Sequence, residues 1–294
     1  MLEGFLIGHA DDQKGGTGVT VLLAKQDAVG GVSVRGASPA TRETDLLRSE
    51  NTVERINAVV LSGGSAYGLE AACGVAEFLK EKGLGYDTGK LRVPIVCGAS
   101  IYDLEYKSFC YPDKEMGKAA CLAAAPLEDG GGMMGAGAGA TVGKLLGMKC
   151  AAKSGIGIAS IRRGKLEVAA VVVVNAFGNV YEPDSKHFVR GCKIGFKAID
   201  IEDALAALER VSINYTNTTI GCILTNAKLS KADANRLADA THDAYSRCIR
   251  PVHTRYDGDA IFVMADGDVE ANAVALHTLA VKAMSQAILN AVSL

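Results

Sequence analysis

The sequence predicts a single α+β domain in which helices cover stacked β-sheets. Apolar residues make up 49% of the 294 positions, so the chain can bury a large core. Its 34 glycines, without any Trp, are typical of a core of small aliphatic side chains with close backbone contacts. Predicted strands come both before and after predicted helices, and no linker or change of composition separates them. We therefore expect one domain over residues 1–294.

The first part of the chain is expected to form strands and one helix. β-Branched residues that recur between glycines predict a pair of strands, at residues 16–24 and 31–36, around a turn at 25–30. Residues 58–83 follow a different pattern, with an apolar run, two glycines and then apolar residues at helical spacing. They predict a strand, a glycine turn and a helix with Ser65 as its N-cap and Gly83 as its stop.

Strands lead into helices again in the rest of the chain. The predicted elements are, in order, a strand at 93–104, a hairpin of 155–163 and 165–180, a strand at 218–225, a helix from Ser230, a buried strand at 260–265 and a helix at 269–292. Ser230 and Asp233 form a capping-box pattern at the start of the first of these helices. Its predicted apolar face consists of Leu237, Thr241, Ala244, Tyr245 and Cys248.

Charge, hydropathy and cysteine patterns argue against several classes of protein. The formal net charge of −2 gives no bias toward nucleic acid or an anionic membrane. The longest apolar run, Val168–Val174, is far shorter than the roughly 20 residues that cross a bilayer. The start of the chain lacks a signal-peptide pattern, and the eight cysteines are scattered without metal-ligand spacing. We expect a cytoplasmic protein with no metal and no nucleic-acid or membrane partner.

A glycine-rich segment resembles two nucleotide-binding motifs but fits neither. Residues 135–140 match G-x-G-x-x-A, yet they follow no predicted strand and open no βαβ unit. The overlapping GAGATVGKL resembles a P-loop, but its spacing is wrong and Leu145 stands where Ser or Thr would bind magnesium. We therefore expect no nucleotide cofactor, and interpret the segment as a tight loop that places Lys144.

The junction at Asn217-Thr218 has three possible interpretations. It could be an ordinary turn, because strands often begin with Thr. It could be a glycosylation acceptor, because Asn214 and Asn217 each begin a sequon, although sequons matter only on a secreted chain. It could also be a self-cleaved peptide bond. A Thr that becomes the first residue of a chain carries a base in its own α-amine, and attack of the Thr218 hydroxyl on the Asn217 carbonyl would free that amine.

Seven motifs in sequence order resemble those of the L-aminopeptidase/D-esterase amidase family, and the resemblance runs through nearly the whole chain. They are GTGVTV, LSGGSAYGLEAA, PIVCGASIYDL, GAGAGATVGKLLG, VVVVNAFGNV, NTTIGCILTNAKLSKADANRLA and IRPVHTRYDGDAIF. The resemblance implies an αββα fold like that of N-terminal-nucleophile hydrolases. It also implies self-cleavage between Asn217 and Thr218, into chains 1–217 and 218–294, and a homotetramer of cleaved protomers. Thr218 would be the nucleophile and Asn175 the oxyanion-hole residue.

Four further residues match one branch of that family. Asp257 and Asp259 match the paired acids of the nylon-oligomer hydrolase, and Tyr102 and Lys144 fall where that branch has an active-site Tyr and Lys. The β-aminopeptidase branch instead has Ser-x-Glu at the place of the two acids. The sequence therefore argues against specificity for β-peptides.

The chemistry of these residues assigns each a role. Alternate residues of an extended segment face one side, so Asp257 and Asp259 can both orient the hydroxyl and amine of Thr218. Two carboxylates would also hold that amine protonated, and Lys144 would offset them. Asn175 would donate its amide to the oxyanion, which contributes about 3 kcal/mol in comparable sites. Tyr102 would hold the substrate or the oxyanion.

Each of these residues also has an ordinary structural explanation as a turn, surface or loop residue, and the ordered family match favours the functional one. The five histidines show no ligand spacing and are interpreted as structural: His9, His187, His242, His253 and His277.

Three functions from different classes remain open at this point. The first is a self-processing amidohydrolase or aminopeptidase that acts on small amides or peptide N-termini. The second is an acyltransferase of the ornithine acetyltransferase type, in which an acyl-Thr218 intermediate passes to an amine. The third is an unprocessed, inactive scaffold.

Overall fold

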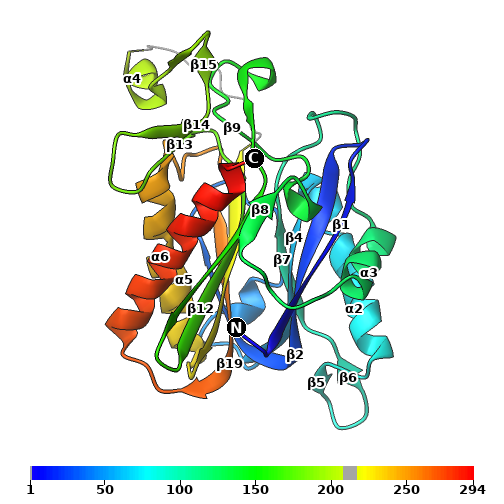
Figure 1. Ribbon diagram of the computed structural model, residues 1–294. Helices are drawn as coiled ribbons and strands as arrows, with labels where there is room; N and C mark the ends of the chain where they lie inside the picture. The colour runs from blue at the N-terminus through cyan, green and yellow to red at the C-terminus, as the bar shows by residue number, and fades with distance from the viewer. Residues whose placement is uncertain (1, 208–216) are drawn as a thin grey trace.

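One mixed sheet of ten strands organises the molecule (Figure 1). The computed structural model describes residues 2–207 and 217–294, and Asn214 of the first sequon lies outside them. The order across the sheet is β3-β7-β4-β2-β19-β17-β12-β11-β8, with β1 also paired to β2. The strands are β1 (Phe5–Asp12), β2 (Thr17–Val34), β3 (Thr41–Arg42), β4 (Arg55–Ser62), β7 (Val96–Ser100), β8 (Gly130–Gly132), β11 (Ile156–Arg163), β12 (Leu166–Asn175), β17 (Thr218–Ala227) and β19 (Ala260–Val269). The β4–β7 and β17–β19 pairs are parallel, whereas the other pairs are antiparallel.

The sheet folds over on itself so that its two halves face each other between two pairs of helices. An apolar cluster joins Val59 and Leu61 of β4 to Val171 of β12 and Phe262 of β19, and fills the space between the halves. A second cluster lies under α5 (Lys231–Cys248) and α6 (Ala273–Val292), and a third lies under α2 (Ala71–Glu81) and α3 (Lys114–Leu122). Figure 1 shows the two helix pairs on opposite sides of the sheet halves. The predicted αββα sandwich is therefore confirmed.

The predicted pair of strands at 16–24 and 31–36 is wrong, because both segments belong to the single strand β2. The segment between them carries a register shift between Leu23 and Ala28 instead of a turn. The first half of β2 pairs with β1, and its second half pairs with β19. Gly31 is explained by helix packing, since a Cβ there would lie 2.4 Å from the carbonyl carbon of Ala234 in α5. β2 thus connects the two halves of the sheet.

The helices follow the predicted signals with two corrections. The capping box of Ser230 and Asp233 is present, and the predicted apolar face of α5 is buried. Ser65 is not an N-cap: it has a φ of 53° and opens the short α1 (Ser65–Gly68), ahead of α2. The last helix begins at Ala273, after its N-cap Asn272, because β19 extends through Val269.

Smaller elements complete the described chain. They are β5 (Tyr86–Asp87) with β6 (Arg92–Val93), β9 (Thr141–Val142) with β10 (Ala152–Lys153), β13 (Asn179–Tyr181) with β14 (Phe188–Arg190) and β18 (Ile249–Arg250), β15 (Lys193–Ile194) with β16 (Lys197–Ala198), α4 (Ile201–Ala206), and three 3-10 turns at Asp45–Leu47, Gly135–Gly137 and Met148–Cys150. All eight cysteines are free thiols. Over residues 2–207 and 217–294, no helix has the length and apolar character needed to cross a bilayer.

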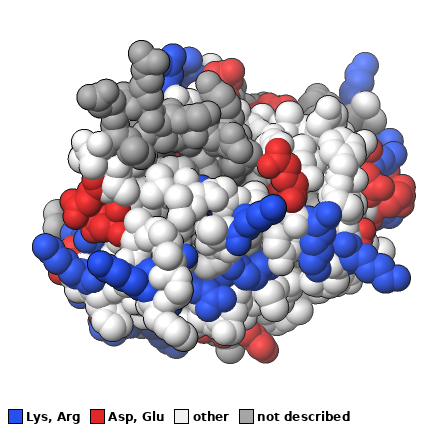
Figure 2. Space-filling model, turned by 90° about the horizontal axis from the view of Figure 1, so that it is seen from above, with Lys and Arg blue, Asp and Glu red and all other residues white. Residues whose placement is uncertain are grey.

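The end of the molecule from which β13 to β15 project carries charges of both signs. Seen from this end, Lys and Arg side chains and Asp and Glu side chains lie interspersed among uncharged residues (Figure 2). This mixture agrees with the formal net charge of −2.

Candidate active site

The Asn217-Thr218 junction lies at the head of the interior strand β17, between β12 and β19. Both residues are buried, with Thr218 only 4% exposed. The hydroxyl of Thr218 contacts the carbonyl oxygen of Asn217, which belongs to the peptide bond just before it. The main-chain N–H of Gly258 donates a hydrogen bond of 3.1 Å to the same oxygen. The uncut junction therefore has a hydroxyl and a hydrogen-bond donor on one carbonyl group.

Gly258 occupies this position because the DGD segment runs alongside the junction. Asp257 forms a parallel β-bridge with Asn217, which brings the next N–H onto the Asn217 carbonyl. A Cβ at Gly258 would lie 2.8 Å from the carbonyl oxygen of Ser38 and 3.2 Å from Oγ1 of Thr218. Only glycine leaves this approach open without displacing the neighbours. Sequence reasoning missed Gly258 because a main-chain donor leaves no side-chain signal.

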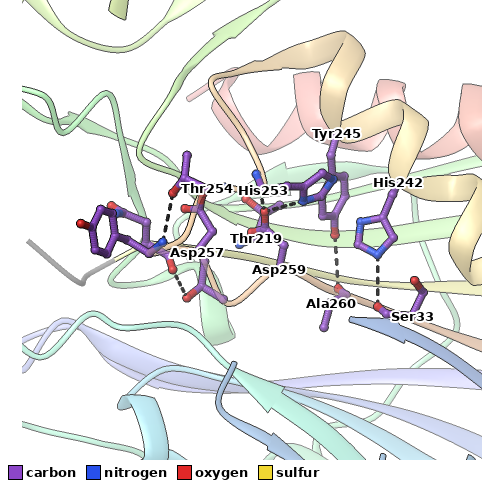
Figure 3. A network of polar contacts seen from close by, with 12 residues as sticks. Ser33, Thr219, His242, Tyr245, His253, Thr254, Asp257, Asp259 and Ala260 are labelled. Atoms are coloured by element: carbon purple, nitrogen blue, oxygen red, sulfur yellow. Dashed lines mark hydrogen bonds and ion pairs between the residues drawn. The ribbon is translucent and has the colours of Figure 1, made fainter. Parts of the chain in front are cut away.

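The two predicted acids bind different main-chain groups around the junction (Figure 3). The Oδ1 of Asp259 accepts a hydrogen bond of 2.6 Å from the N–H of Thr219, and its Oδ2 accepts one of 2.8 Å from Nδ1 of His253. Asp257 accepts the N–H of Thr254 at 2.6 Å. In the uncut chain the pair thus fixes the backbone on both sides of the site, while the hydroxyl of Thr218 contacts the carbonyl of Asn217.

Asn175 and Lys144 form the opposite side of the site. Asn175 is the register partner of Thr218 in the β12–β17 ladder. Lys144 Nζ donates to the side-chain oxygen of Asn175 at 2.8 Å and to its main-chain oxygen at 3.0 Å. The Asn175 amide nitrogen donates to the carbonyl of Tyr102 at 2.9 Å. These bonds place the amide of Asn175 beside Thr218 on a fully buried strand end.

Burial shifts the charges of the site toward neutrality. It lowers the pKa of the Lys144 ammonium to about 7, against the opposing charges of Asp257 and Asp103. Burial also raises the pKa of Asp257 to about 6, and the neighbouring charge of Asp259 adds to this rise, whereas Lys144 opposes it. The expected repulsion between the two acids and its offset by Lys144 are both consistent with these shifts.

The glycine-rich segment that leads to Lys144 is held by a second, partly buried lysine, Lys153. Lys153 Nζ donates to the main-chain oxygens of Gly137 and Ala140, at 2.9 Å each, and of Ser154 at 2.5 Å. The segment then continues to Thr141, whose N–H donates to the Asn175 side-chain oxygen at 3.1 Å. Lys153 therefore anchors the loop that leads to Lys144.

The structure brings the predicted residues Thr218, Asn217, Asn175, Lys144, Asp257 and Asp259 together at the ends of β12, β17 and the DGD segment. Tyr102 joins them through its main-chain carbonyl, while its hydroxyl donates to Glu105 at 3.2 Å.

Two residues of this region have no role in the sequence interpretation. His253, interpreted as structural, binds Asp259. Asp103 is a buried carboxylate whose pKa burial raises to about 6 against the charge of Lys144. A lone His or a loop Asp carries no spacing signal that could have identified either.

Comparisons with known proteins agree along the whole chain. The model of peptidase family S58 matches residues 2–294. An uncharacterized aminopeptidase of Mycobacterium leprae is 42% identical over 272 residues, which are 88% of this chain and 73% of that protein. The 6-aminohexanoate-oligomer endohydrolase of Kocuria sp. (strain KY2) is 32% identical over 308 residues, covering 98% of this chain and 84% of that protein.

Solved structures share the fold at lower identity. A β-aminopeptidase of Burkholderia sp. superimposes with a TM-score of 0.71 at 17% identity, over 99% of this chain and 84% of its own. The L-aminopeptidase D-Ala-esterase/amidase of Ochrobactrum anthropi, described as a variant of the Ntn hydrolase fold, gives a TM-score of 0.70 at 14% identity, with the same coverage.

Proposed function

The chain belongs to peptidase family S58, a family of peptidases and amidohydrolases, and on that premise we propose that Thr218 is its nucleophile, freed by self-cleavage of the Asn217-Thr218 bond. The observation that carries the proposal is the convergence of the Thr218 hydroxyl and the Gly258 N–H on the Asn217 carbonyl oxygen. A buried carbonyl that is polarised by a fixed donor and contacted by a hydroxyl is positioned for acyl transfer.

Self-cleavage would proceed as an acyl shift from nitrogen to oxygen. Thr218 Oγ1 bonds to the Asn217 carbonyl carbon, and the Gly258 N–H stabilises the oxyanion. The hydroxyl proton passes to the departing amide nitrogen of Thr218 as the C–N bond breaks. The resulting ester is hydrolysed by water, which leaves a carboxylate on Asn217 and a free hydroxyl and α-amine on Thr218. The protein would then consist of chains 1–217 and 218–294.

In turnover the α-amine of Thr218 would act as the base for its own hydroxyl. The hydroxyl attacks the carbonyl of a small amide or of the first residue of a peptide, and the amine proton is given to the leaving group. Water then hydrolyses the acyl-Thr218 ester. Asn175 is assigned to the oxyanion because it is the cross-strand partner of Thr218. Asp257, Asp259 and Lys144 hold the junction and balance its charge.

The relatives support a proposal for the substrate class. Similar proteins include aminopeptidases and a hydrolase of 6-aminohexanoate oligomers, so we propose amides with a free or nearby amino group. Hydrolysis of amino-acid p-nitroanilides and of 6-aminohexanoate dimer by purified, cleaved protein would test this. Transfer of the acyl group to added amine, without net hydrolysis, would instead support the acyltransferase. We also propose a homotetramer of cleaved protomers, which a monomeric mass by light scattering would contradict.

Changing Lys144 to Met should move the acid limb of the pH profile of kcat/KM to higher pH. A nearby cation disfavours the protonated form of the Thr218 amine and so lowers the pKa of that amine. Removing the cation raises this pKa, and the amine must be neutral to act as a base. Lys144 is positively charged below its own pKa of about 7, so it carries its charge over the acid limb of the kcat/KM profile. A shift to lower pH, or none, would remove Lys144 from the charge balance.

Replacing the peptide bond between Asp257 and Gly258 by an ester should slow self-cleavage about 100-fold, as loss of one oxyanion donor does elsewhere. Glycolic acid incorporated at position 258 removes the N–H that donates to Asn217 and adds no side chain. The matched control is an ester at Tyr256, whose N–H donates to the Thr254 hydroxyl at 3.2 Å and not to the Asn217 carbonyl. Gel time courses of the purified precursor would give both rate constants, and equal rates would show that Gly258 does not stabilise the oxyanion.

A further inference from the structure

The carboxylate of Asp259 joins the backbone after the nucleophile to a histidine. Its Oδ1 accepts the N–H of Thr219 at 2.6 Å. Its Oδ2 accepts two donors from one residue, the main-chain N–H of His253 at 3.2 Å and ring Nδ1 at 2.8 Å. With both oxygens engaged, the carboxylate has one defined orientation. The position of the Thr219 N–H, one residue beyond Thr218, is coupled to that orientation.

The ring of His253 is itself held by packing. It stacks against Tyr245 with a centroid distance of 5.9 Å, and meets the ring of His242 edge-on at 4.8 Å. Figure 3 shows the three rings together on the side of Asp259 away from Asp257. His242 is anchored in turn, because its Nε2 lies 3.1 Å from the carbonyl oxygen of Ser33. This aromatic group of His242, Tyr245 and His253 leaves the His253 ring little freedom to leave Asp259.

The backbone conformation of His253 is also part of its contact with Asp259. Its φ of 55° lies in the left-handed region, which is uncommon for residues other than glycine, although histidine, like asparagine and aspartate, adopts it more often than most. This conformation coincides with the placement of both the main-chain N–H and the ring nitrogen on a single carboxylate oxygen. An unfavourable backbone conformation held by surrounding packing is typical of a position that a functional site requires.

The hydrogen-bond pattern assigns the tautomer. Nδ1 must carry a proton to donate to the carboxylate, so a neutral ring has its lone pair on Nε2. Nε2 is buried and has no hydrogen-bond partner in the part of the chain that the structure describes. A lone pair is tolerated there more cheaply than an unpaired N–H would be. The ring therefore acts on the site through Nδ1 and Asp259.

We propose that His253 is a positioning residue, which orients Asp259 and through it the backbone of Thr219 and the hydroxyl of Thr218. The proposal rests on the proposed function, in which Thr218 attacks the Asn217 carbonyl. His253 takes no proton from Thr218 in this scheme. Its contribution is the fixed geometry of the attacking group, to which acyl-transfer rates are highly sensitive.

The test compares two substitutions that differ in the donor. His253→Asn places an amide N–H near the position of Nδ1 and tolerates the left-handed backbone, whereas His253→Gly tolerates the backbone and keeps the main-chain donor to Asp259 but has no side-chain donor. Both remove the ring from the aromatic group, and His253→Gly also removes the rest of the side chain. His242→Asn removes a ring from the same group without touching Asp259, and serves as the packing control. Thermal unfolding of each, in a Thr218→Ala background that cannot cleave, reports on folding.

We expect self-cleavage of the purified precursor to stay within about 5-fold of wild type in His253→Asn and His242→Asn, and to slow at least about 10-fold in His253→Gly, the range for losing a hydrogen bond to a charged group. Equal rate constants in His253→Asn and His253→Gly would overturn the proposal. So would a loss in His242→Asn as large as that in His253→Gly, because packing alone would then explain it.

A second readout does not depend on cleavage. In the Thr218→Ala background, hydrogen exchange of the Thr219 amide should accelerate at least about 10-fold in His253→Gly relative to His253→Asn, because Asp259 then holds that N–H less firmly. Exchange that does not differ between the two variants would refute the positioning role. If the wild-type precursor stays intact while exchange responds as expected, the proposed function fails and the role of His253 stands.

Discussion

We expect purified wild-type protein to run on a denaturing gel as two fragments, while Thr218→Ala stays a single chain of 30.5 kDa. Dividing that mass in proportion to chains 1–217 and 218–294 gives about 22 and about 8 kDa, and the smaller fragment should begin with Thr218 on Edman sequencing, as an N-terminal nucleophile requires. Thr218→Ala removes the attacking hydroxyl, so neither self-cleavage nor turnover should be measurable.

The same variant should keep its fold. Ala removes only a hydroxyl and a methyl group at the head of β17, whose pairing with β12 and β19 uses the main chain. The Gly258 N–H still reaches the Asn217 carbonyl, so the junction keeps its backbone contact. An unfolding temperature within a few degrees of the uncut wild type would show that lost activity comes from chemistry.

Thr218→Ser is the matched control. It retains the hydroxyl but loses the methyl group that limits the rotamers, so it should still cleave, more slowly. An intact 30.5 kDa chain that nevertheless hydrolyses amides would contradict the mechanism, because an uncut Thr218 has no amine to act as a base. An intact and inactive wild type, after days of incubation at several pH values, would favour the inactive scaffold.

Substitution of Asn175 should lower kcat by about 100-fold or more with little change in KM, because the oxyanion exists only along the reaction path. Two variants distinguish the loss of the amide N–H donor of Asn175 from the loss of its whole side chain. Asn175→Asp keeps the side-chain oxygen that accepts from Lys144 and Thr141 but replaces the N–H donor by an oxygen. Asn175→Ala loses both functions and leaves the buried Lys144 ammonium with one partner fewer.

We therefore expect both variants to be slow per cleaved N-terminal Thr and less stable to denaturant, by about 1–3 kcal/mol for a lost partner of a buried group, because each loses the hydrogen bond from the Asn175 amide to the Tyr102 carbonyl. Initial rates should be normalised to the amount of cleaved chain, because slow self-cleavage would otherwise be counted as slow turnover. A kcat close to that of wild type in Asn175→Asp would show that the amide of Asn175 does not stabilise the oxyanion.

The sequence predicts elements well where a periodic pattern and a local end signal coincide. The capping box at Ser230 and the hairpin turn at Gly164, which has a φ of 61°, are confirmed because each depends on neighbouring residues only. β2 was predicted wrongly because Gly31, near its middle, is explained by close contact with Ala234 in a helix about 200 residues further along the chain. Glycine alone does not distinguish a turn from a close helix contact.

In the candidate site, too, some features could be predicted from the sequence and others could not. Side chains with distinctive chemistry, such as Asn175, Lys144 and the two acids, could be proposed from the sequence and its resemblance to a family. The Gly258 N–H and the His253 contact could not, because a main-chain donor has no residue type and a hydrogen bond to Asp259 needs the left-handed backbone at position 253. These contacts depend on the path of the chain, which only the fold determines.

The position of the junction within the sheet also has a consequence for folding. β17 is an interior strand, and the chain after Asn217 supplies β17, β19, α5 and α6, which pack in one core with strands from before it. A protein cut at this bond would have folded as one chain but would exist as two that share a core. Refolding after denaturation would then require two separate molecules to meet, so it would depend on concentration and compete with aggregation. Once cut and then denatured, the protein would therefore regain its folded state less readily than the intact chain first reached it.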